Sequence, residues 1–156
     1  MSEDRSGASA GDERSREEDS VTLERINPEQ LGRPSGFAHA VRATDTVRVY
    51  LAGQTALDKA GSIVGAGVVA QFEQALGNLL TALAAAGGRP EHLATVTIYL
   101  VDIADYRAHA REIGAVWRRL AGTEYPAMAG IGVNRLWDRD ALVEVQGVAA
   151  ITAPAG

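Results

Sequence analysis

Residues 66–101, AGVVAQFEQALGNLLTALAAAGGRPEHLATVTIYLV, form the stretch that decides the fold. From about Ala66 to Ala86, apolar residues recur at spacings of three and four, which predicts an amphipathic helix that Gly87 and Gly88 end. Residues 94–101 are rich in β-branched side chains and are bounded by turn signals, which predicts a strand. The apolar stripe of the helix consists of Phe72, Ala75, Leu76, Leu79, Leu80 and Leu83.

Similar patterns continue on both sides of this unit. Asp45 is the expected turn residue before a strongly β-forming run, and Asp102 or Asp105 is the expected cap of a second helix. The expected order is β-β-β-α-β-α-β-β, which indicates an α+β domain with a mixed sheet and two helices packed on one face. Strands are predicted over 21–26, 37–41, 46–53, 127–133 and 141–151.

The domain organisation follows from composition. Residues 1–20 carry seven acids and three arginines with almost nothing to bury, so we expect a disordered acidic leader. Residues 21–153 have the composition of a single domain of ordinary size, and 154–156 form a short tail. The leader holds most of the net charge of −5, because the other 136 residues carry 13 acids and 12 bases.

Charge and composition exclude several classes of function. A nearly neutral domain lacks the basic stripe that nucleic acids require. The pair Arg118-Arg119 is interpreted as part of a solvated face or as a complement to a helix dipole at a helix end. No apolar run approaches the roughly 20 residues that span a bilayer, so we expect no membrane partner. The absence of cysteine fits a reducing cytoplasm. The three histidines show no ligand spacing, so neither a metal nor another cofactor is expected.

The expected sheet also bears on assembly. Its strands are apolar on both faces, whereas the helices cover only one of them. If the second face of the sheet were exposed to solvent, it would present a large apolar patch, which soluble monomers rarely carry. We therefore expect the chain to associate with copies of itself through the sheet.

An ordered set of segments resembles the RidA/YjgF (reactive intermediate deaminase) family over roughly residues 24–151. The resemblance implies a chorismate-mutase-like fold and a homotrimer, in which the sheets form a central barrel and the clefts lie between neighbouring subunits. The segments are Phe37-Ala38-His39-Ala40-Val41, Leu51-Ala52-Gly53-Gln54, 71–80, 96–100, Tyr125-Pro126-Ala127 and Leu142-Val143-Glu144-Val145.

The resemblance also implies an activity, the hydrolysis of reactive enamines and imines. Family members with this activity use a Pro-Ala-Arg motif whose arginine binds the substrate carboxylate through two hydrogen bonds. Here the motif is Pro126-Ala127-Met128, and methionine offers an apolar surface instead of a cation. We therefore expect a small-molecule substrate that is less anionic than 2-aminoacrylate.

Other family positions are retained in part. Glu144 matches the glutamate that positions the hydrolytic water and is the expected catalytic residue. Gly53 and Gly130 match main-chain contacts with the substrate. Phe37 replaces a frequent tyrosine, and Ala110 stands where active deaminases commonly have asparagine.

Two further residues are expected near the substrate. His39 lies in a segment that the resemblance places beside the cleft, where it either contacts the ligand or makes a structural hydrogen bond. Arg135 either supplies a substitute anion contact across the subunit boundary or pairs with Asp138 or Asp140 at the surface.

Two hypotheses from different classes remain. The first is an enzyme that adds water to, or tautomerises, an imine- or enamine-type compound in a cleft between subunits. The second is a non-catalytic trimer that binds a metabolite or a partner loop. Glu144 favours the enzyme, whereas the losses at Met128, Phe37 and Ala110 favour the binder. Ribonuclease activity is disfavoured by the lack of a basic surface.

Overall fold

The computed structural model describes residues 22–153, so Val21, the leader expected over 1–20 and the tail expected over 154–156 lie outside the described residues. The long helix and the strand that follows it are both present. In chain order the elements are β1 (Thr22–Ile26), β2 (Ala40–Thr44), β3 (Thr46–Gln54), α1 (Gly67–Ala85), the 3₁₀ turn η1 (Pro90–His92), β4 (Leu93–Leu100), α2 (Ile103–Ala108), α3 (Ala110–Ala121), β5 (Ala127–Gly132) and β6 (Val143–Thr152).

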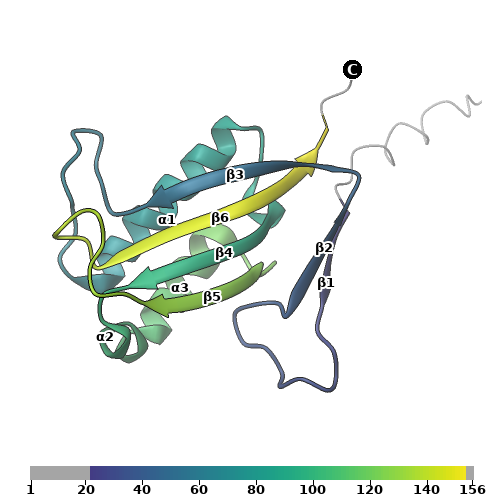
Figure 1. The fold of residues 1–156 in the computed structure, drawn as a ribbon, viewed down its shortest axis with the longest axis horizontal. Helices are drawn as coiled ribbons and strands as arrows, with labels where there is room; N and C mark the ends of the chain where they lie inside the picture. Colours follow the sequence, from purple (N-terminus) through teal and green to yellow (C-terminus); the bar gives the residue numbers. More distant parts are fainter. Residues whose placement is uncertain (1–21, 154–156) are drawn as a thin grey trace, which may run out of the picture.

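The main sheet has four strands in the order β3-β6-β4-β5. Strands β4 and β5 are parallel, and the other two pairs are antiparallel. Figure 1 shows α1 and α3 on one face of this sheet, while β1 and β2 form a separate antiparallel hairpin. The mixed α+β architecture with its helices on one face is therefore confirmed.

The core lies between α1 and the inner face of the sheet. Phe72 and Leu76 from the helix are buried against the cluster that includes Val96, Val143 and Val145. Each such side chain contributes about 1.5–3 kcal/mol when it is removed from water. The period of 3.6 in α1 and the period of 2 in β6 direct these residues toward one another, so the sequence pattern defines the core.

Two local predictions were wrong. The second helix is divided into α2 and α3 at His109, whose φ of −106° and ψ of 16° interrupt the helical path. The second predicted strand, 37–41, begins later than expected: β2 pairs with β1 only from Ala40 onward, because Ala38 instead forms a parallel bridge to Ala127. Asp102 is the cap of α2, since its carboxylate accepts a hydrogen bond from the backbone N–H of Asp105 at 3.0 Å.

The face of the sheet that points away from the helices differs from expectation. Its side chains include Glu144 and Gln146 on β6 and Tyr99 and Thr97 on β4, so it is mixed rather than apolar. Tyr50 on β3 is 73 % exposed. The composition of this face therefore does not by itself require self-association, and the homotrimer stays a prediction. Within residues 22–153, no helix is long and apolar enough to cross a membrane.

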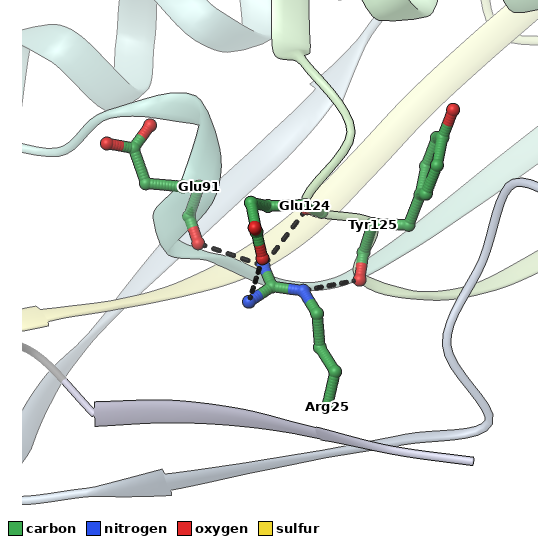
Figure 2. A network of polar contacts seen from close by, with 4 residues as sticks. All are labelled: Arg25, Glu91, Glu124 and Tyr125. Carbon is green, nitrogen blue, oxygen red and sulfur yellow. Dashed lines mark hydrogen bonds and ion pairs between the residues drawn. The ribbon is translucent and has the colours of Figure 1, made fainter.

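A partly buried arginine ties the β1–β2 hairpin to the main body (Figure 2). From β1, Arg25 donates hydrogen bonds to the carbonyl oxygens of Tyr125 at 2.9 Å, Glu91 at 3.1 Å and Glu124 at 3.0 Å, and it also pairs with the Glu124 carboxylate at 3.2 Å. Its side chain is only 18 % exposed. Because Tyr125 directly precedes Pro126, this arginine fixes the entry to β5.

Replacing Arg25 by glutamine should lower the free energy of unfolding by about 1–3 kcal/mol, because three backbone carbonyl groups lose a charged donor. Urea unfolding followed by circular dichroism measures the change. Arg42→Gln is the matched control, since within residues 22–153 Arg42 forms its ion pair with Glu24, on the exposed side of the same hairpin. Exposed pairs contribute about 0–1 kcal/mol, so equal losses in both variants would contradict the role of Arg25.

Candidate functional site

The half-buried carboxylate of Glu144 lies directly against Gly53 on the neighbouring strand. Strand β3 has an irregularity between Leu51 and Gln54, and Gly53 falls within it. A Cβ atom at position 53 would lie 2.9 Å from Cδ of Glu144 and closer still to Oε1. Two residues that the sequence assigned to the site are thus in contact, and only glycine at position 53 leaves room for the carboxylate.

The electrostatic environment favours the protonated form of Glu144. Burial raises the pKa of its carboxyl group, and the negative charge of Asp138 raises that pKa further. Asp138 is held in place by Thr55, which directly follows β3 and donates from Oγ1 to Oδ2 of Asp138 at 2.7 Å. A carboxyl group with a raised pKa holds a proton more readily than a free glutamate, which makes it a better proton carrier in acid–base chemistry.

Polar side chains from α1 hold the loop before β6. Gln71, only 4 % exposed, donates to the carbonyl oxygen of Asp140 at 3.1 Å and accepts from the N–H of Leu142 at 2.8 Å. Asn78 donates to the carbonyl oxygen of Thr55 at 3.0 Å. These contacts fix both chain segments that position Asp138. Gln71 is therefore a buried polar residue of α1 that serves the loop before β6.

A second set of expected site residues meets on the other side of the sheet. Phe37, Met128 and Gly130 line one cavity of about 320 Å³. The N–H of Ala38 donates to the carbonyl oxygen of Pro126 at 2.9 Å, which holds the Phe37 segment alongside the start of β5. The motif Pro126-Ala127-Met128 and the aromatic ring at position 37 are thus neighbours.

An adjoining cavity, also of about 320 Å³, shares Met128 and continues toward α3. Ala110 lies in its wall, which agrees with its assignment to the pocket. Arg118 is exposed in the last turn of α3, as expected for a solvated helix end, and it also borders this cavity. The other residues of the wall are Ser35, Gly36, Phe72, Ile98, Tyr106, Ile113, Gly114, Trp117 and Tyr125.

The two sets of residues occupy opposite faces of the sheet. Met128 is the register partner of Val96 and packs against the core on the helix side. Glu144 is the register partner of Tyr99 and lies on the face without helices. Alternation along the strands keeps these faces separate. One chain therefore presents a carboxylate half-site (Gly53, Glu144 and Asp138) and an apolar half-site (Phe37, Met128 and Gly130), and does not join them.

The remaining two expected residues lie outside both half-sites. His39 makes structural contacts: its Nε2 is 2.7 Å from the carbonyl oxygen of Gly32, and its ring packs edge-on against Phe37. Arg135 is exposed, and its Nε donates to the carbonyl oxygen of Leu136 at 3.3 Å. Within the described part of the chain, Arg135 forms no ion pair with Asp138 or Asp140. Neither residue lines the cavities around Met128.

The comparison with known families decides the relationship. A family model described as endoribonuclease L-PSP matches residues 30–151, which include both half-sites. The chain belongs to this family, RidA/YjgF.

Individual relatives of this RidA/YjgF chain cover most of its length. A RutC family protein from Pyrococcus horikoshii is 31% identical, over 80% of this chain and 94% of the relative. A 2-iminobutanoate/2-iminopropanoate deaminase from Capra hircus is 32% identical, over 72% of this chain and 78% of the relative. A crystal structure of a conserved Rid family protein from Yersinia pestis has a TM-score of 0.75 at 31% identity, and the match covers 83% of this chain and 98% of that one.

Between residues 22 and 153, no group of three or more histidine, aspartate or glutamate side chains is arranged to hold a metal ion. The RidA/YjgF half-sites contain a carboxylate at Glu144 and apolar walls around Met128.

Proposed function

We propose that this RidA/YjgF protein hydrolyses or tautomerises an imine- or enamine-type small molecule, with Glu144 as the catalytic residue. The observation that carries the proposal is the half-buried Glu144 carboxylate, which is held against Gly53 and has a raised pKa. The deaminase name of the mammalian relative supports the same class of substrate.

The reaction needs a group that moves protons next to a C=N carbon. A water molecule held by Glu144 adds through its oxygen to that carbon, and the glutamate takes one proton from the water and passes it to the imine nitrogen, so that the C=N double bond becomes a single bond. The resulting carbinolamine then expels ammonia and leaves a carbonyl group. When the substrate is an enamine, the same carboxyl group protonates the carbon of the C=C bond that is not bonded to nitrogen. The imine forms when the nitrogen gives up a proton. General acid–base catalysis of this kind contributes about 10²–10⁴-fold.

In the proposed mechanism, a complete site requires two copies of the chain. The carboxylate half-site and the apolar half-site lie on opposite faces of one sheet, so the apolar half-site of a neighbouring copy would complete the cleft. This arrangement agrees with the homotrimer that the family resemblance implies. Phe37 and Met128 would supply the walls, the main chain of Gly53 and Gly130 would contact the substrate, and His39 and Arg135 would border the cleft.

The test uses purified protein and imines generated in place by an amino-acid oxidase, together with neutral imines prepared chemically. Release of ammonia is compared with buffer alone and with Glu144→Gln. We expect the wild-type protein to accelerate hydrolysis of at least one class. If the wild-type protein hydrolyses neither acidic nor neutral imines faster than Glu144→Gln does, the proposal is wrong.

The second candidate function is a non-catalytic trimer that binds a metabolite. It is favoured by the two adjoining cavities around Met128, which are lined largely by apolar side chains. Ligand binding without turnover of any imine would support it over the enzyme.

The pH dependence of turnover should respond to Asp138. Removing its charge in Asp138→Asn removes one of the two causes that raise the pKa of Glu144. If the carboxylate form is the proton acceptor, the rise of kcat with pH should move to lower pH in this variant. The pKa of Glu144 should stay above its ordinary value, because burial still raises it. Profiles of kcat against pH measure this.

Asp140→Asn is the matched control for that experiment. Asp140 lies in the same loop, but its charge does not contribute to the raised pKa of Glu144. Its profile should coincide with that of the wild-type protein. Identical profiles for Asp138→Asn and the wild type would show that Asp138 does not act on the catalytic group.

A further inference from the structure

The two arginines in the last turn of α3 have different surroundings. Arg119 forms an ion pair with Glu73 on α1. Arg118, one position earlier, forms no ion pair with any carboxylate in the described part of the chain. Its positive charge is therefore available to an anion that is not part of this chain.

The guanidinium of Arg118 bends back along the helix over Gly114. A Cβ atom at position 114 would lie 3.3 Å from Nη1 of Arg118. Both residues line the cavity that also contains Ala110 and Met128. The glycine thus leaves room for the guanidinium at the rim of this cavity, one helical turn before Arg118 itself.

The rest of this cavity suits an apolar group. Phe72, Tyr106 and Trp117 contribute aromatic surface to its wall. Trp117 is 5 % exposed, and its indole N–H has no hydrogen-bond partner in residues 22–153. The indole N–H itself is shielded from solvent, so Trp117 contributes apolar ring surface to the wall.

We propose that Arg118 binds the carboxylate of an apolar substrate, so that the substrate class is a 2-imino acid with an aromatic or branched aliphatic side chain. This inference rests on the proposed function, since it assigns the charged end of the substrate to the same cleft. The guanidinium forms two parallel hydrogen bonds with the carboxylate, and the side chain of the substrate occupies the cavity of about 320 Å³.

This assignment changes what Met128 implies about the charge of the substrate. The methionine removes a cation from β5, and the sequence alone therefore suggested a less anionic substrate. Arg118 supplies a cation to the same cavity from α3 instead. Met128 then enlarges the apolar wall, which favours larger side chains than those of 2-aminoacrylate.

The experiment measures binding of 3-phenylpropanoate and of its neutral amide, 3-phenylpropanamide, by isothermal titration calorimetry. The wild-type protein should bind the acid more tightly than the amide. Arg118→Gln should weaken binding of the acid by about 10- to 100-fold and leave the amide unchanged, because a charge-assisted pair is lost. Arg119→Gln is the matched control and should bind both compounds like the wild type.

The second variant is Gly114→Ala, which keeps the charge and improves helix propensity. Its added methyl group meets the guanidinium, so acid binding should weaken by a few-fold while the fold becomes no less stable. Equal affinity of Arg118→Gln and wild type for the acid, or no binding of the acid by the wild type, would overturn the assignment.

Turnover separates this inference from the proposed function. If imines are hydrolysed but KM for acidic imines is unchanged in Arg118→Gln, the assignment of Arg118 is wrong and the proposed hydrolase function stands. If the acid binds through Arg118 but no imine is hydrolysed, the anion site stands and the proposed function fails.

Discussion

Replacing Glu144 by glutamine should lower kcat for imine hydrolysis by about 10²–10⁴-fold, the usual contribution of a positioned acid–base group. Glutamine keeps the shape and the contact with Gly53 but can neither accept nor return a proton. KM should change little, because the substrate is bound by other groups. Steady-state release of ammonia from imines supplied at several concentrations measures both constants.

The stability of the same variant serves as its control. The pKa of Glu144 is raised in the folded protein, so the native state holds its proton more tightly than the unfolded chain does. The wild type therefore loses stability as the pH rises through that pKa, and Glu144→Gln does not. The variant should be at least as stable as the wild type at neutral pH, with a smaller difference in acid. A large loss of stability would mean that lost activity reflects unfolding.

Replacing Gly53 by alanine should lower kcat by about 10- to 100-fold while the carboxylate is still present. The added methyl group occupies the space of the Glu144 side chain, which must turn away from its position on the sheet. A displacement of about 1 Å at a catalytic group can cost about 10²-fold. Kinetic constants for the same imines measure the effect.

Gly77→Ala is the control for this substitution. Gly77 lies in α1, and a Cβ atom there would meet nothing within 4 Å. Its activity should equal that of the wild type. The double variant Gly53→Ala with Glu144→Gln should lose no more activity than Glu144→Gln alone, because the methyl group acts through the carboxylate. Additive losses would show that Gly53 acts by another route.

The fold could be predicted largely because its strongest signals are local. The stripe of α1 and the alternation around Val143 and Val145 depend only on spacing along the chain. The break at His109 carries no glycine or proline signal, so a continuous helix was expected there. The expected apolar outer face was wrong because Glu144, Gln146 and Tyr99 share it, and that grouping depends on strand register.

The site could be predicted only in part. Glu144 and Gly53 were both identified through resemblance to the family, but their contact depends on an irregularity in β3 that no residue pattern marks. Asp138 was considered only as a partner of Arg135, because its link to Thr55 joins positions 83 residues apart. Arg118 was set aside because its contact with the cavity depends on the direction of its side chain, although Gly114 one turn earlier was the available signal.

The positions of the two tryptophans in the chain have a practical consequence. Trp117 is 5 % exposed in the wall of the cavity, whereas Trp137 is 92 % exposed, beside Asp138. Indole fluorescence shifts to shorter wavelength when water is excluded from the ring, so the protein carries two intrinsic reporters with different emission. The emission at shorter wavelength comes from Trp117 and reports ligand binding in the cavity. The emission at longer wavelength comes from Trp137 and reports burial of the loop beside Asp138.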